Sequence, residues 1–130
     1  KKYSLLGGVE EFAAQLCETM NKNTGLIAAV TDRDTVIAIA GGGRRELLGK
    51  QIAPALEQVM EARRPVLAPE GRLLPVCEGN DQFSASAAVP ILSEGDLLGL
   101  VLLIGTEPAG EAEWKLAQAI ASFLGKHMES

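Results

Sequence analysis

The apolar run at positions 97 to 104, LLGLVLLI, constrains the fold more than any other stretch of this sequence. Only Gly99 interrupts it. A helix that spans a membrane needs about 20 apolar residues, so this run is far too short for one. Strands that are buried on both faces have such continuous apolar runs, whereas strands with one wet face alternate. The sequence therefore predicts a central strand in a sheet that carries a layer on each face.

The segment before this run, residues 84 to 93, is predicted to pair with it as a β-hairpin. Glu94 and Gly95 supply the turn, because glycine tolerates the positive φ that tight hairpin loops need. The segment alternates, which predicts that one of its faces is less apolar than the other. The more apolar face would carry Ala85, Ala87, Val89 and Ile91, and the other face Ser84, Ser86, Ala88 and Pro90.

The rest of the chain supplies helices and short strands around this hairpin. Helical spacing of apolar residues predicts helices at residues 3 to 22, 44 to 64 and 111 to 130. Short β-branched runs predict a second hairpin from residues 26–31 and 35–40, and residues 72–77 are strand-like within an irregular stretch from 65 to 83. This order predicts one α+β domain, residues 1 to 130, on a mostly antiparallel five-stranded sheet.

Composition and charge exclude several classes of function. With 130 residues, 47% of them hydrophobic, the chain holds a single core. Its net charge of −5 argues against binding nucleic acid or an anionic membrane through its own surface. Cys17 and Cys77 lie far apart without CxxC spacing, so we expect no metal site, no redox pair and a cytoplasmic, reducing location. Because the first residue is Lys1, we expect a piece of a longer protein.

The order of elements resembles the GAF domain. Three pieces, KKYSLLGGVEEFAAQLCETMNKNTG, GGGRRELLGKQI and VPILSEGDLLGLVLLI, resemble the C-terminal regulatory domains of the stage V sporulation protein T family, transcription regulators with an AbrB-like DNA-binding domain. The resemblance implies a sheet with the first and last helices on one face and the middle helix and loop on the other. It also implies a non-enzymatic regulator of sporulation genes, activator or repressor, that binds DNA only through an upstream domain joined at residues 1 to 8.

The sequence departs from several relatives of the GAF type in ways that exclude their ligands. Residues 80 to 83, NDQF, do not match the Asn-Lys-Phe-Asp-Glu signature of cyclic-nucleotide-binding GAF domains. His127, the single histidine, is far in sequence from both cysteines, which argues against a bilin chromophore. Gly49 and Lys50 are followed by Gln51, so the P-loop pattern fails. We therefore expect no cofactor.

A small-ligand site is expected between the sheet and its loop-rich face, because long loops on a rigid scaffold often carry function. Glycines 41 to 43 before Arg44 could cradle an anion, although a flexible turn with a solvated basic pair explains them as well. Two alternatives stay open: the loop is exposed surface that binds no ligand, or the protein's own side chains fill the pocket. The candidate ligand-binding residues are Gly42, Arg44, Cys77, Glu78, Asn80, Asp81, Phe83, Ser84 and Ser86.

Self-association is expected through the terminal helix with the first helix beside it. The apolar arc of the terminal helix is wider than the roughly 100° that covering a sheet requires. A monomer would leave part of it facing water, so a homodimer is predicted, and the family resemblance implies a homotetramer of the full protein. The candidate interface residues are Leu5, Phe12, Leu116, Ile120, Phe123 and His127, with Ala117 and Ala121 packed towards the sheet.

Two other functions remain possible from the sequence. The first is a small redox enzyme like the GAF-type methionine sulfoxide reductases, although those need closely placed cysteines and two distant ones fit poorly. The second is a purely structural dimerisation module whose interior is filled.

Overall fold

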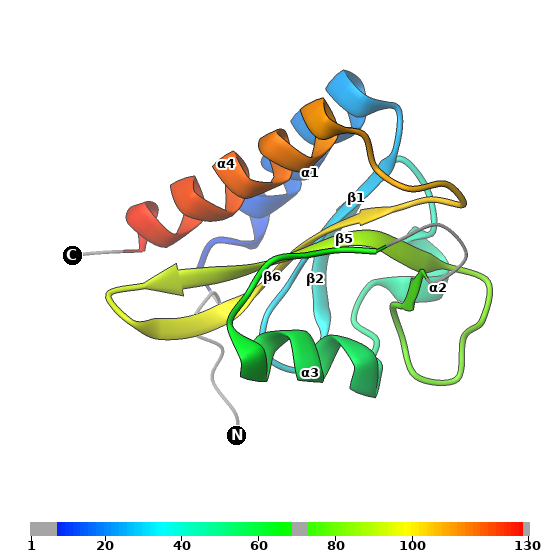
Figure 1. Ribbon diagram of the computed structural model, residues 1–130, viewed down its shortest axis with the longest axis horizontal. Coiled ribbons are helices and arrows are strands. Elements are labelled where there is room, and N and C mark those ends of the chain that lie inside the picture. Colours follow the sequence, from blue (N-terminus) through cyan, green and yellow to red (C-terminus); the bar gives the residue numbers. More distant parts are fainter. Residues whose placement is uncertain (1–7, 69–72, 129–130) are drawn as a thin grey trace.

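The computed structural model describes residues 8–68 and 73–128 and has an α+β architecture, as the sequence predicts (Figure 1). The described part of the chain has six strands rather than the expected five. They are β1 (Ile27–Thr31), β2 (Val36–Ala40), β3 (Val66–Leu67), β4 (Leu74–Pro75), β5 (Ser84–Ser93) and β6 (Asp96–Ile104). One antiparallel sheet holds them in the order β2-β1-β6-β5-β3, and β4 also pairs with β5.

Helices cover both faces of the sheet. α1 (Glu10–Thr24) and α4 (Glu111–His127) lie side by side on one face, while α2 (Arg44–Leu47) and α3 (Pro54–Ala62) lie on the other (Figure 1). This is the arrangement that the GAF resemblance implies. The expected helix start at residues 3 to 7 falls outside the described residues. Within those residues, no helix combines the length and the apolar character that crossing a membrane requires.

The central strand β6 is buried on both faces, which confirms the prediction from its continuous apolar run. Val101 and Leu103 pack in the cluster beneath α1 and α4, whereas Leu100 and Leu102 pack in the cluster beneath α3. All four side chains are fully buried. Burying a side chain of this size stabilises the fold by roughly 1.5–3 kcal/mol relative to leaving it exposed. β6 therefore contributes buried side chains to both hydrophobic clusters of the core.

Gly99 interrupts this run because its neighbour on β1 leaves no room for a side chain. A Cβ atom at Gly99 would collide with the backbone carbonyl of Thr31. At the same point the Thr31 hydroxyl accepts a hydrogen bond from the Leu100 backbone N–H at 3.2 Å and donates one to the Asp32 carbonyl at 2.8 Å. Thr31 thus satisfies its buried hydroxyl while β1 and β6 lie in close contact.

The predicted more apolar face of β5 needs one correction: Ala87, Val89 and Ile91 pack together beneath α1 and α4, whereas Ala85 packs on the opposite face of the sheet. Ala85 pairs with Ile104 and Ala87 with Leu103, so Ser86 is the extra residue of a β-bulge. The bulge places Ala85 beneath α3 and Ala87 beneath α1 and α4, instead of on one face. Residues 85 to 91 are buried throughout. Small alanines fit here because layers cover both faces of the strand.

The stretch expected to be helical, residues 44 to 64, forms two helices with an extended segment between them, and Pro54 stands in the first turn of the second helix. Gly49 has a φ of +78°, and Pro54 favours an extended conformation at Ala53, so neither position continues a helix. The extended segment makes three isolated bridges to other segments, Val36 to Leu48, Thr35 to Gln51 and Ile52 to Cys77. Of the strand-like residues 72 to 77, only Leu74 and Pro75 form β4, and position 72 lies outside the described residues.

Candidate functional site

A cavity of about 430 Å³ opens at the end of the sheet where β1 begins and β6 ends. Ile27 and Ile104 are register partners across these strands, so both side chains belong to the same end of the sheet. Four apolar side chains form its walls, and polar side chains from the loop before β5 and the turn after β6 complete it. The lining residues are Ile27, Leu73, Asp81, Gln82, Phe83, Ser84, Ile104, Gly105 and Thr106. We call this the sheet-end cavity.

Backbone hydrogen bonds hold the loop that forms one side of the sheet-end cavity. The Val76 N–H donates to the Phe83 carbonyl at 3.3 Å, and the Gly105 N–H donates to the Ser84 carbonyl at 3.2 Å. The Asn80 side-chain oxygen accepts a hydrogen bond from the Gln82 N–H at 2.8 Å, which shapes the tip of the loop. These bonds fix the positions from which polar side chains face the cavity.

The glycine turn at residues 41 to 43, for which anion binding or a flexible turn stayed open, lies behind the wall of the sheet-end cavity. A Cβ atom at Gly43 would lie 3.3 Å from the Phe83 ring, and one at Gly42 would lie 3.3 Å from the Ile27 side chain. Glycines 41, 42 and 43 all have positive φ, so the turn requires their conformational freedom. Arg44 is exposed and does not line the cavity. The turn therefore shapes the wall.

Three of the nine candidate ligand-binding residues line the sheet-end cavity: Asp81, Phe83 and Ser84. The other six do not. Cys77 and Ser86 are buried, and the Ser86 hydroxyl donates to the Leu103 carbonyl at 3.3 Å within the sheet. Gly42, Arg44 and Glu78 are exposed and Asn80 is half-buried, all outside the lining.

Sequence reasoning missed the lining residues Ile27, Ile104, Gly105 and Thr106. Ile27 begins β1 and Ile104 ends β6, and their neighbours in sequence include further apolar residues, so local pattern does not distinguish them; Gly105 and Thr106 follow in the turn after β6. Only the pairing of β1 with β6 identifies Ile27 and Ile104 as neighbours.

The two cysteines lie on opposite faces of the sheet. Cys17, on α1, belongs to the hydrophobic cluster between the sheet and α1 and α4, and Cys77 belongs to the cluster between the sheet and α3. Burial raises the pKa of Cys17 to about 12, and the neighbouring Glu18 carboxylate adds to this rise. Burial also raises the pKa of Cys77, with Lys50 acting in the opposite direction. Both thiols are therefore protonated at neutral pH, and the sheet separates them.

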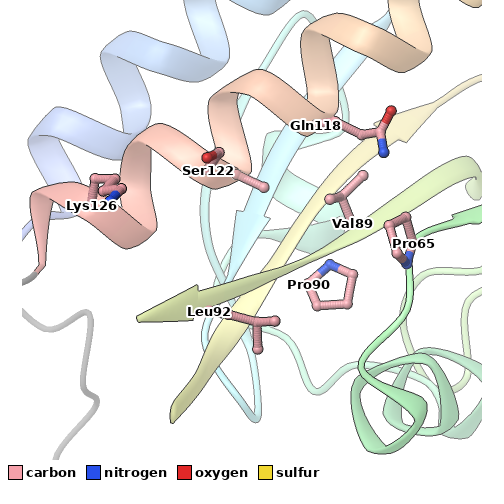
Figure 2. Close-up of a pocket in the computed structure, with 8 residues that line it drawn as sticks. Pro65, Val89, Pro90, Leu92, Gln118, Ser122 and Lys126 are labelled. Carbon is pink, nitrogen blue, oxygen red and sulfur yellow. The ribbon is translucent and has the colours of Figure 1, made fainter. Parts of the chain in front are cut away.

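A second hollow, of about 290 Å³, lies between α4 and the outer part of β5 (Figure 2). Its α4 side carries Gln118, Ser122 and Lys126, which recur every four residues along one helix face. Its other side is formed by Pro65, Val89, Pro90 and Leu92. None of the candidate ligand-binding residues lines it. We call this the helix-edge hollow.

The predicted self-association surface contains a cluster of three aromatic rings from α1 and α4. The Phe12 ring centroid lies 4.5 Å from that of His127 and 5.8 Å from that of Phe123. Phe123 is 51% exposed, which is unusual for so large an apolar side chain. Phe12 is half-buried and His127 is exposed. We call Phe12, Phe123 and His127 the aromatic cluster.

Other interface expectations need correction. Ile120 is buried within the chain rather than facing water, because it belongs to the cluster beneath α1 and α4. Leu116 is half-buried against the same cluster. Ala117 and Ala121 are buried, as the sequence predicts. Leu5 lies outside the described residues.

The sequence matches one protein family over nearly its whole length. The model of that family, described as "Stage V sporulation protein T C-terminal, transcription factor", matches residues 8–129. Stage V sporulation protein T of Bacillus subtilis is 31% identical over 131 residues, which cover 99% of this chain and 74% of the relative.

Solved structures with a similar fold include GAF domains from several bacteria. The GAF domain of a phosphoenolpyruvate-protein phosphotransferase from Acinetobacter matches with a TM-score of 0.72 at 12% identity, covering 98% of this chain and 84% of that one. The cofactor-binding GAF domain of the nutrient sensor CodY from Clostridium difficile has a TM-score of 0.63 at 14% identity, over 88% and 83% of the two chains. A type II free methionine-R-sulfoxide reductase from Thermoplasma acidophilum has a TM-score of 0.69 at 11% identity, over 92% and 94%. At such identities the likeness shows the GAF fold alone.

Proposed function

The chain belongs to the stage V sporulation protein T C-terminal family, and from that premise we propose that it senses a small ligand and self-associates to control DNA binding. As a GAF-fold member of a transcription factor family, it is a regulatory domain. The finer proposal has three parts: a ligand in the sheet-end cavity, a homodimer through the aromatic cluster, and a DNA-binding domain upstream. The Bacillus subtilis relative is longer than this chain, which covers 74% of it.

The observation that carries the proposal is the exposed Phe123 in the aromatic cluster, beside the central ring of Phe12. Contiguous exposed apolar surface often marks a contact with a partner, and here the exposed Phe123 continues into the half-buried Phe12 ring beside it. Two-fold pairing of identical chains is the commonest way to cover such a patch. A dimer through α1 and α4 would bring the N-terminal ends of two chains into a defined arrangement.

A chain of contacts leads from the sheet-end cavity to α1. Ile27 and Gly105 line the cavity, and a Cβ atom at Gly105 would lie 3.2 Å from the Leu26 side chain. The Leu26 carbonyl accepts a hydrogen bond from the Asn21 side-chain amide at 2.8 Å, and Asn21 lies in the last turns of α1. A ligand against Ile27 would therefore act on the segment that holds the C-terminal end of a helix in the proposed interface.

Regulation then requires a difference in ligand affinity between two arrangements of the subunits. A ligand shifts such an equilibrium only by that difference. A coupling of about 1–3 kcal/mol is typical of allosteric proteins and changes affinity about 5- to 150-fold. That range is enough to alter how often a transcription factor occupies its operator. We place this action in the cytoplasm, where the DNA is, and assign the full protein a homotetramer.

Native mass spectrometry of the freshly purified chain tests both the dimer and the ligand. We expect a dimer mass with an added mass that is lost when the protein is denatured. A monomer at every concentration would contradict the proposed assembly. A dimer with no added mass, in a chain that also binds no small molecule when a metabolite library is added, would favour the purely structural module.

A reductase is the second candidate, because the Thermoplasma enzyme shares the fold. The positions of the cysteines argue against it, since Cys17 and Cys77 lie on opposite faces of the sheet with raised pKa values. Incubation with free methionine sulfoxide and a thiol reductant should give no turnover. Turnover that disappears in Cys77→Ser would favour the enzyme instead.

A further inference from the structure

We propose that the sheet-end cavity takes a small primary amine with a short hydrocarbon body, an inference that rests on the proposed ligand-sensing function. The cavity is near the lower end of the roughly 300–1,000 Å³ that small-molecule pockets span. Its walls combine branched aliphatic side chains with one aromatic ring, from Ile27, Ile104, Leu73 and Phe83. Such walls favour a compact apolar body, because burying apolar surface drives binding in proportion to its area.

The charge of the sheet-end cavity defines the head group of the ligand. Asp81 is the one ionisable residue among the described residues of the lining. Within residues 8–68 and 73–128 its carboxylate has no ion pair or hydrogen bond, so it is available to a ligand. The Phe83 ring borders the same space, and a cation that lies over an aromatic face gains further electrostatic attraction. The hydroxyl oxygens of Ser84 and Thr106 can accept hydrogen bonds from the remaining ammonium N–H groups.

Anions fit the sheet-end cavity poorly for the converse reason. Among the residues that the structure describes, no lysine or arginine belongs to its lining, and Arg44 lies outside it. A phosphate or carboxylate placed there would lose hydration without gaining a charged partner and would face the Asp81 carboxylate. A zwitterionic amino acid meets the same difficulty at its carboxylate. The helix-edge hollow, by contrast, has Lys126 as the ionisable group among its described lining residues and suits the opposite charge.

Three probes with one hydrocarbon body separate these ligand classes: 3-methylbutylamine, leucine and 4-methylpentanoate. Amide NMR titrations of the ¹⁵N-labelled chain should show the amine binding most tightly, with shifts centred on Phe83, Ser84 and Gly105. Added salt should weaken this binding by screening. Asp81→Asn should weaken it about fivefold, the upper range for a solvent-accessible ion pair. The matched control is Asp96→Asn, at an exposed aspartate that begins β6, which should bind the amine like the parent.

Charge reversal gives the sharpest comparison. Asp81→Arg should lose amine binding and gain binding of 4-methylpentanoate at the same amides, while Asp96→Arg should change neither. If leucine or 4-methylpentanoate binds the parent as tightly as the amine at those amides, or if Asp81→Asn has no effect, the amine assignment is wrong and the ligand site stands. If no probe shifts these amides, or shifts appear only around Ser122 and Lys126, the sheet-end site itself is wrong.

Discussion

Gly125 on α4 lies directly against the backbone carbonyl of Leu92 on β5, so close that a Cβ atom at Gly125 would collide with it. Gly125 is buried within the last turns of the helix. This contact lets the C-terminal half of α4 approach the sheet. It thereby fixes where Phe123 and His127, on the same part of α4, lie relative to the core. It therefore joins the core to the proposed interface.

Gly125→Ala should lower the free energy of unfolding by about 1–3 kcal/mol, the usual cost of forcing a side chain into a packed contact. The sign of this change in stability is informative, because Gly→Ala at an exposed helix position stabilises the fold by about 1 kcal/mol. Urea denaturation followed by circular dichroism measures it. Ser122→Ala, an exposed change one turn earlier on α4, is the matched control and should alter stability little. An increase in stability for Gly125→Ala would contradict the close contact.

The raised pKa of Cys17 makes stability depend on alkaline pH. The thiol has an ordinary pKa of 9.0 in the unfolded chain and about 12 when folded, so the folded state favours the protonated form. Its stabilising effect is full below pH 9 and is lost as the pH rises from 9 towards 12. The difference in unfolding free energy between the parent and Cys17→Ala should be constant below pH 9 and then shrink by about 1.4 kcal/mol per pH unit. A difference that does not change between pH 8 and pH 11 would show that the thiol is not desolvated.

The isolated chain should not bind DNA at physiological salt. Its net charge is −5, and neutralisation of phosphates by lysine and arginine supplies most non-specific affinity. True binders reach non-specific dissociation constants of about 10⁻⁴ to 10⁻⁶ M. A gel shift with a mixed-sequence duplex is the measurement. A micromolar complex that weakens steeply with added salt would refute the assignment of DNA binding to an upstream domain.

Burial and helix ends could be predicted wherever a short stretch of sequence is enough to indicate them. The unbroken apolar run of β6 predicts a strand covered on both faces, and Gly25, with a φ of +76°, ends α1 where the asparagine- and glycine-rich segment indicates. The β-bulge at Ser86 could not be predicted, because it depends on register with β6 rather than on the residue itself. The start of α3 at Pro54 could be predicted from the sequence, because proline disfavours a helical conformation at the residue before it.

The candidate site was predictable only in part, for a related reason. The loop residues Asp81 and Phe83 follow from the length and polarity of their segment, but Ile27 and Ile104 meet only because the first hairpin pairs with the last one. Ile120 was misplaced because the wide apolar arc of α4 is shared between the sheet and α1. Part of the surface assigned to a second copy is thus covered within the chain.

Sedimentation velocity tests the central claim, self-association through the aromatic cluster, most directly. Across the micromolar range the parent should sediment as a dimer, and Phe123→Glu should sediment as a folded monomer, because a charge would be buried without a partner. Leu67→Glu is the matched control, since Leu67 on β3 is 41% exposed and lies outside the cluster, and it should remain dimeric. A parent that is monomeric throughout, or a Phe123→Glu variant that remains a folded dimer, would contradict the account.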